Sequence, residues 1–140
     1  MPYAFNDLLS RLVGCRLYSV QFVIDYVQLR FDSDEIDDQP LLNCDVWPVV
    51  LASGRTLSNG MDGYSDAFRR LICQRVVHTF EQSASGLRIE FESLALVFRP
   101  EPGEIQGPEI ASLFGFLDRR WMTWRPGEEA FEYLSGDSEG

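Results

Sequence analysis

The chain has 140 residues, a hydrophobic fraction of 45%, an aromatic fraction of 13% and a formal net charge of −10. This length fits one domain with its own core, and the composition excludes a disordered chain. The negative charge removes the general electrostatic attraction to nucleic acid and to anionic membranes, so we expect neither, and it favours a basic protein as partner.

The basic residues and the cysteines exclude several chemistries. All 12 basic residues are arginine, so Schiff-base catalysis and a phosphate-loop lysine are excluded. Cys15, Cys44 and Cys73 are odd in number and form no Cys-x-x-Cys pair, which argues against a disulfide framework or a zinc ribbon. Free thiols indicate a reducing compartment, and we expect a cytoplasmic protein without signal peptide or membrane span.

The first predicted element recurs later in the chain. Apolar residues at helical spacing predict a short helix over 5–13, and the same pattern returns over 64–72, displaced by 59 positions. The matched apolar pairs are Phe5 and Tyr64, Leu8 and Ala67, Leu9 and Phe68, Leu12 and Leu71, and Val13 and Ile72. Asn6 and Ser65 occupy equivalent sites at the start of the two segments and are suitable helix N-caps.

A pair of predicted strands follows each helix. Residues 17–24 lead into an alternating segment over 27–32, and residues 76–80 lead into another over 87–92. Strict alternation, as in Leu87, Ile89 and Phe91 between polar neighbours, is typical of half-buried antiparallel strands. The displacement changes from 59 to 60 between the two strands of the pair, because one residue is gained at the hairpin.

A third strand closes each unit, at 42–46 after an acidic insertion over 33–40, and at 94–98 directly after the second hairpin. Residues 49–57 predict a further hairpin that links the units. Two amphipathic units can resemble each other by chance, but a register kept through helix, cap and strands favours an internal duplication, with repeats at about 5–50 and 64–100.

Beyond Pro100 the pattern changes. Pro108 and the apolar spacing of Ile110, Leu113, Phe114 and Leu117 predict a helix over 108–117. Residues 121–124 read as a short strand, residues 128–134 as one or two helical turns, and residues 135–140 as a disordered tail.

These elements predict an α+β fold in a single domain over residues 1–134. Two units, each a helix plus three antiparallel strands, are related by a pseudo-twofold axis, and a C-terminal helix and short strand complete the domain. Each unit has too little core to fold alone, so we expect their sheets to pack face to face or to join into one curved sheet.

One stretch carries a resemblance. Residues 14–32, with the core Asp25-Tyr26-Val27-Gln28-Leu29, and the tryptophan-rich segment near the end resemble small uncharacterised proteins of GC-rich bacteria. The resemblance covers about two thirds of the chain and implies no activity and no site residues.

Three groups of residues were weighed for chemistry. The acidic run 32–38 does not fit a helix-loop-helix calcium loop, which requires an acidic or amide residue at position five and glycine at position six. An irregular cation site and a solvated loop both stay open there. His78 is the single histidine, and Glu90 and Glu92 share one strand face that we expect to be solvated.

No residue is therefore assigned a catalytic, cofactor-binding or metal-binding role. Tryptophan is enriched at interface hot spots, so Trp47, Trp121 and Trp124 form the candidate interaction surface. Trp121 and Trp124 are separated by an odd number of residues on a strand and should point to opposite faces.

The sequence leaves two classes of function open. The first, which we favour, is a non-catalytic binding or regulatory module, for example an immunity-type inhibitor of a basic toxin. The second is a small-molecule-binding protein or enzyme with its site in the groove between the repeats. A homodimer is compatible with the sequence but does not follow from it.

Overall fold

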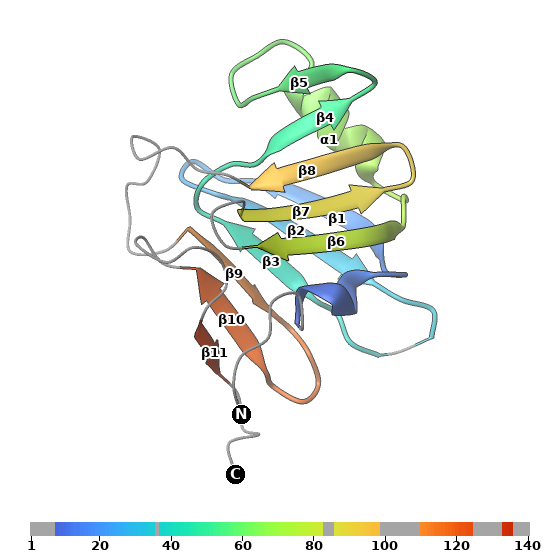
Figure 1. The fold of residues 1–140 in the computed structure, drawn as a ribbon, viewed down its shortest axis with the longest axis vertical. Helices are drawn as coiled ribbons and strands as arrows, with labels where there is room; N and C mark the ends of the chain where they lie inside the picture. The colour runs from blue at the N-terminus through green and yellow to red at the C-terminus, as the bar shows by residue number, and fades with distance from the viewer. Residues whose placement is uncertain (1–7, 36, 83–85, 99–109, 125–132, 136–140) are drawn as a thin grey trace.

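A computed structural model of the chain describes residues 8–35, 37–82, 86–98, 110–124 and 133–135 (Figure 1). Two helical segments are present in this part of the chain, the 3₁₀ helix η1 (Leu9–Leu12) and the α-helix α1 (Tyr64–Leu71). The strands are β1 (Arg16–Phe22), β2 (Val27–Asp32), β3 (Leu41–Cys44), β4 (Val49–Ala52), β5 (Arg55–Leu57), β6 (Val76–Gln82), β7 (Gly86–Phe91), β8 (Leu94–Phe98), β9 (Ala111–Phe114), β10 (Trp121–Trp124) and β11 (Tyr133–Ser135).

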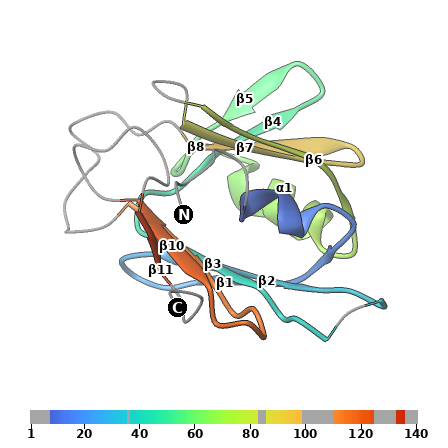
Figure 2. The ribbon, with the colours of Figure 1, turned by 60° about the horizontal axis from the view of Figure 1, so that its bottom comes forward.

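The strands form two antiparallel sheets. Sheet A has six strands in the order β1-β2-β3-β9-β10-β11, and sheet B has five in the order β5-β4-β8-β7-β6. Figure 2 shows the two sheets one above the other, with η1 and α1 between them. The predicted α+β class is wrong, because the described part of the chain is mostly antiparallel β with a single α-helix.

The two halves of the chain exchange hairpins. The first half places β1, β2 and β3 in sheet A and then sends the hairpin β4–β5 to sheet B. The second half places β6, β7 and β8 in sheet B and then sends β9 and β10 to sheet A. Neither sheet is complete without the other half. The predicted units of one helix and three strands are therefore not separate bodies, and the linking hairpin predicted over 49–57 is confirmed as β4–β5.

The strand register of the two halves corresponds residue by residue. Leu17 pairs with Phe31 in sheet A, and Val76 pairs with Phe91 in sheet B, which are the residues 59 and 60 positions later. Each first strand has a β-bulge at the next position, between Leu17 and Ser19 and between Val76 and His78. That this correspondence arose by duplication stays a prediction.

The halves meet along a backbone contact. Val76 donates its N–H to the carbonyl oxygen of Cys15 at 2.9 Å, and Leu17 donates to the carbonyl oxygen of Gln74 at 3.1 Å. These two hydrogen bonds are equivalent under the 59-residue displacement. An isolated antiparallel bridge between Arg16 and Arg75 lies at the centre of the contact, where a pseudo-twofold axis would pass.

Local signals for the first two helices were partly correct. The helix predicted over 64–72 is α1, in which Tyr64, Ala67, Phe68 and Leu71 are buried at helical spacing. Its N-cap is Gly63, with φ of 91°, rather than Ser65. The segment predicted as a helix over 5–13 contains η1, and the chain is extended at Val13. Residues 5–7, including the predicted cap Asn6, lie outside the described residues.

The predicted C-terminal helix over 108–117 is wrong, because residues 111–114 form β9. Ala111 and Leu113 are fully buried while Phe114 is exposed, so the alternation of a strand overrides the helical spacing. The edge of β3 provides unpaired backbone groups that β9 satisfies, a long-range partner that periodicity does not reveal. The helical turns predicted over 128–134 fall mostly outside the described residues, and Tyr133, Leu134 and Ser135 form β11, so the predicted tail begins inside a strand.

One continuous core lies between the sheets. The predicted alternation in β7 is confirmed, since Leu87, Ile89 and Phe91 are buried and Arg88 and Glu90 are not. Phe31 of sheet A and Phe91 of sheet B stack across the core with ring centroids 6.5 Å apart. The equivalent residues of the two halves therefore join the two sheets.

Candidate functional site

The tryptophans do not gather into one surface. Trp47 packs against the core, with its ring 5.5 Å from that of Phe22 and 6.3 Å from that of Tyr64. Trp121 is half-buried on the outward side of β10, next to the fully buried Met122. The side chain of Trp124 lies outside the described part. The Trp47 ring is therefore part of the packing between the halves.

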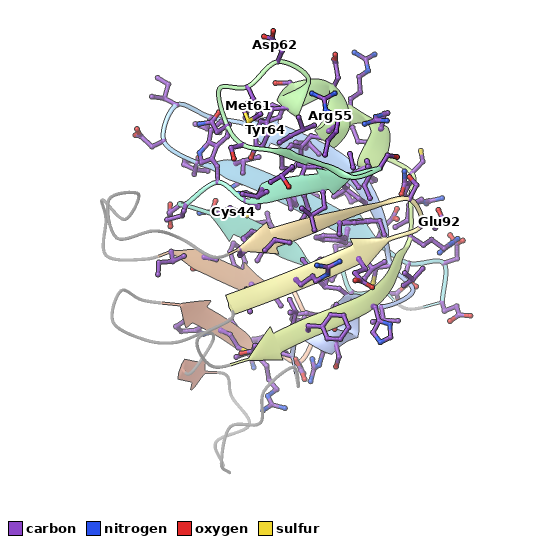
Figure 3. All side chains as sticks on the ribbon, turned by 45° about the horizontal axis from the view of Figure 1, so that its top comes forward. Cys44, Arg55, Met61, Asp62, Tyr64 and Glu92 are labelled. Atoms are coloured by element: carbon purple, nitrogen blue, oxygen red, sulfur yellow. The ribbon has the colours of Figure 1, made fainter. Side chains whose placement is uncertain are left out.

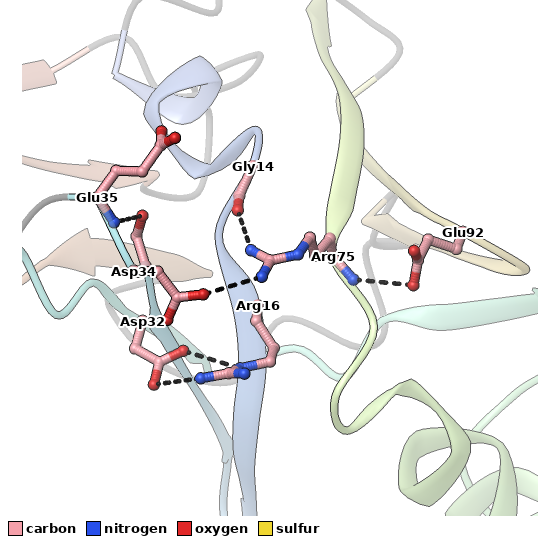
Figure 4. A network of polar contacts seen from close by, with 8 residues as sticks. Gly14, Arg16, Asp32, Asp34, Glu35, Arg75 and Glu92 are labelled. Carbon is pink, nitrogen blue, oxygen red and sulfur yellow. Dashed lines mark hydrogen bonds and ion pairs between the residues drawn. The ribbon is translucent and has the colours of Figure 1, made fainter.

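The acidic segment 32–38 is tied to the body of the protein (Figure 4). Arg16 donates two hydrogen bonds to the carboxylate of Asp32, each 3.2 Å long. Arg75 donates to Asp34 at 3.2 Å and to the carbonyl oxygen of Gly14 at 3.0 Å. Asp38 accepts the backbone N–H of Leu117 at 2.7 Å. Among the described residues no group of three or more histidine, cysteine, aspartate or glutamate side chains is placed to hold a metal ion.

The three thiols and the histidine differ in their exposure to solvent. All three cysteines are free, with Cys15 and Cys44 buried and Cys73 exposed. Burial raises the pKa of the Cys44 thiol well above its ordinary value, and burial, followed by the charges of Asp38 and Asp32, raises the pKa of Cys15. These two thiols stay protonated and are poor nucleophiles. His78 is exposed, and its ring stacks on Phe80 with centroids 4.9 Å apart.

A groove of about 470 Å³ opens on sheet B beside the hairpin turns. The hairpin β4–β5 supplies one wall, with Ser53, Arg55 and Thr56, and the strand β7 and its turn supply the other. The residues of that second wall are Arg88, Glu90, Glu92 and Ser93, and the floor holds Leu51 and Ala95. Figure 3 labels Arg55 and Glu92, which belong to opposite walls.

The floor of the groove carries smaller side chains than the equivalent positions of sheet A. The register places Ala95 of β8 where sheet A has Leu41 of β3, and Leu51 of β4 where sheet A has Phe114 of β9. Leu57 pairs with Val50 in sheet B as Met122 pairs with Leu113 in sheet A. The residues just before them, Thr56 and Trp121, are therefore equivalent. Bulkier side chains occupy the equivalent positions of sheet A.

The outward-facing residues of sheet B, which we call the outer face of sheet B, form two rows across the strands. One row holds His78, Glu90, Ala95, Leu51 and Thr56, and the next holds Phe80, Arg88, Val97 and Val49. Phe80 has 40% of its surface exposed. The Arg88 guanidinium and the Glu90 carboxylate, 2.7 Å apart, are the charged residues between the apolar ones.

The row of sheet A that is equivalent to the Phe80 row is polar, whereas the neighbouring row carries Leu41, Phe114 and Trp121. Gln21 stands where sheet B has Phe80, and Asn43 stands where it has Val97. Gln28, equivalent to Arg88, donates a hydrogen bond from Nε2 to Oδ1 of Asn43 at 3.2 Å. Asn43 in turn donates to Asp45 at 3.5 Å. The two halves share a backbone plan but differ in what they present to the outside.

The comparisons with protein-family models, with curated proteins and with solved structures return no match for this chain. The resemblance to small proteins of GC-rich bacteria therefore stays a prediction. In the part of the chain that the structure describes, no helix is both long enough and apolar enough to cross a membrane.

Sequence reasoning did not identify the outer face of sheet B. It treated Glu90 as part of a solvated strand face and His78 as an isolated residue. A signal was available in the repeat itself, because Gln21 and Phe80 are 59 positions apart and differ sharply in polarity. A comparison of equivalent outward positions points to the Phe80 row, in which sheet B is apolar at positions where sheet A is polar.

Proposed function

We propose that this protein is a non-catalytic binding module that holds a basic protein partner on the outer face of sheet B, in a reducing compartment such as the cytoplasm. The observation that carries the proposal is the contrast between the Phe80 row of sheet B and the equivalent row of sheet A. Phe80 and Val97 are outward where the same backbone positions of sheet A carry Gln21 and Asn43. An immunity-type inhibitor of a basic toxin is one specific form of this function.

The fold does not require apolar side chains on that face. Sheet A shows that glutamine and asparagine fit the same register. An exposed phenylalanine gains about 1.5–3 kcal/mol only when it is removed from water. Contiguous exposed apolar residues are a mark of interaction sites in soluble proteins, and aromatic anchors in such patches account for much of the binding free energy.

The groove on this face is suited to a basic side chain of the partner. Glu90 and Glu92 share a wall, and Glu92 already accepts the backbone N–H of Arg75 at 3.3 Å. The chain carries a net charge of −10, which attracts a basic partner over distances limited by salt to about 8 Å in physiological buffer. The net charge sets the rate of encounter with the partner, and the row that holds Phe80, Val97 and Val49 supplies contact area.

The small-molecule alternative has less support. The groove volume of about 470 Å³ is within the range of ligand sites, which is about 300–1,000 Å³. Ligand pockets, however, enclose most of the ligand behind apolar and aromatic walls, whereas the groove residues on the described strands include neither tryptophan nor tyrosine. The groove lies on the outer face of sheet B, between the hairpin β4–β5 of the first half and the strand β7 of the second half.

The proposal is tested by site-specific photo-crosslinking in cells of the source organism. A benzophenone amino acid replaces Phe80 on sheet B or, as the matched control, Gln21 on sheet A. We expect position 80 to capture a basic protein that position 21 does not. The captured protein is then purified and its affinity for the wild-type chain is measured by calorimetry at two salt concentrations. Failure of the purified pair to bind, or equal capture from both positions, would contradict the proposal.

A further inference from the structure

The outer face of sheet B is complementary to itself. Arg88 and Glu90 lie two residues apart on β7, with Ile89 between them facing the core. Consider a twofold axis that is parallel to the sheet, perpendicular to its strands and at the level of Ile89. A second copy related by this axis lies face to face with the first, and each row of one copy lies opposite the other row of its mate. Each Arg88 would then meet a Glu90 of the other copy, and each Glu90 an Arg88. We propose that a second copy of this chain covers this face when the partner is absent.

The same operation matches the apolar residues. It places His78 against Phe80 of the other copy, Ala95 against Val97, and Leu51 against Val49, so ring opposes ring and aliphatic side chain opposes aliphatic side chain along the rows. Isologous contact of this kind requires that each patch contain its own complement, which Arg88 and Glu90 provide as a pair of opposite charges. Face-to-face sheets pack about 10 Å apart with interdigitated side chains.

The size of the face sets the strength of the dimer. Five strands spaced by about 4.8 Å give a width of about 24 Å, and the five residues of β8 give a length of about 17 Å. A contact of this extent is smaller than the roughly 800 Å² per partner of a standard stable interface. The dimer is therefore weak and reversible, as it must be if a partner is to displace it.

Salt distinguishes the dimer from the complex with a partner. Two copies that each carry a charge of −10 repel each other, and salt screens this repulsion together with the attraction in the Arg88–Glu90 pairs, so the dimer responds to salt less than a complex of opposite charges does. Screening weakens the attraction between an acidic chain and a basic partner. This inference rests on the proposed function in one respect only, the statement that the dimer occupies the partner's surface and so regulates access to it.

Sedimentation velocity of the full chain tests the dimer directly. We expect the dimer fraction to rise with protein concentration from micromolar to millimolar, and to change less with salt than the affinity for the basic partner does. Arg88→Glu and Glu90→Arg, each introduced singly, should weaken association by about tenfold or more, because each sets like charges opposite one another. The double variant Arg88→Glu/Glu90→Arg should restore it. Thermal unfolding of each variant, measured in parallel, shows that the monomer is folded.

Four results separate the possibilities. A chain that stays monomeric at every concentration and salt overturns the dimer, and the photo-crosslinking result for the partner then stands by itself. A dimer that is indifferent to Arg88→Glu, or that the double variant does not restore, overturns the pairing. A dimer that responds to the charge exchange while position 80 captures no basic protein supports the dimer and contradicts the proposed function.

Discussion

Gly14 and Cys73 hold equivalent positions in the two halves, and both have a left-handed backbone, with φ of 89° and 84°. Gly14 donates its N–H to the carbonyl oxygen of Val76 at 2.8 Å, and Cys73 donates to that of Leu17 at 2.7 Å. Each turn thus ties its own half to the first strand of the other. The contact between the halves requires this left-handed conformation at both positions. The first half has glycine there, and the second half has cysteine.

The first prediction concerns this pair. Gly14→Ala should lower the free energy of unfolding by about 1–2 kcal/mol, because a left-handed conformation costs that much for a residue with a Cβ atom. The space around Gly14 is open, so no steric clash adds to the cost. Cys73→Gly should change it by no more than about 0.5 kcal/mol, since relief of the strain is offset by the freedom of glycine in the unfolded chain. Urea unfolding measures both. An equal loss in the two variants would show that strain in the left-handed conformation does not decide the cost.

A second prediction addresses the close approach between β9 and the segment before β3. A Cβ atom on Gly115 would lie 2.5 Å from the carbonyl oxygen of Gln39, and φ there is 100°. Gly115→Ala should therefore destabilise the protein by about 2–3 kcal/mol through backbone strain. The control is Gly60→Ala, where φ is 95° but the space is open, and about 1–2 kcal/mol is expected. Equal losses in thermal unfolding would mean that the backbone at Gln39 moves aside.

The elements that the sequence predicted well are those whose signals are local. Alternation located β2, β7 and β8, and the 59- and 60-residue displacements of Leu17 and Phe31 anticipated the pairing in sheet B. The exchange of hairpins could not be predicted, because the apolar face of β4 fits either sheet and only the free edge of β8 decides it. The same reason explains β9, where helical spacing in Leu113 and Leu117 competed with a distant strand edge. Leu117 is 70% exposed and makes no helical face.

The third prediction tests the core between the sheets. Phe31→Ala and Phe91→Ala should each cost about 3–5 kcal/mol, through lost transfer free energy and the cavity left behind. The double variant should cost less than the sum, because the two rings stack on each other. Where an alanine variant does not fold, the leucine variants give the same comparison. Glu90→Gln, on the outer side of the same strand, should change stability by no more than about 0.5 kcal/mol. If Glu90→Gln unfolds the protein while Phe91→Ala is tolerated, the inward and outward faces of β7 are the reverse of those described.

Alkaline pH provides a fourth prediction. Burial raises the pKa of Cys44 in the folded protein, whereas in the unfolded chain the thiol ionises at its ordinary pKa of about 8.5. The stabilisation is complete below that pH and is lost as the pH rises above it, because only the unfolded state releases the proton. Urea unfolding between about pH 7 and about pH 10 should show a steeper loss for wild type than for Cys44→Ala. Parallel curves for the two proteins would mean that Cys44 is accessible to solvent.

The candidate site was harder to predict than the fold. The sequence placed emphasis on Trp47, Trp121 and Trp124 because of their size, but the ring of Trp47 is used in packing against Phe22 and Tyr64. Exposure is a property of the assembled sheets, so the size of a side chain does not reveal it. Phe80 is less conspicuous in the sequence than any tryptophan, and only the polar side chain of Gln21 at the equivalent position shows that the fold does not need it.

The central claim is that the outer face of sheet B is a contact surface for a protein partner and that of sheet A is not. The most direct test is the calorimetric affinity of the captured partner for two matched variants, Phe80→Gln/Val97→Asn on sheet B and Gln21→Ala/Asn43→Ala on sheet A. The first pair copies onto sheet B the residue types that sheet A already accommodates, so the fold should be retained. We expect the sheet B variant to bind at least about tenfold more weakly than the sheet A variant. Equal affinities for the two variants would contradict it.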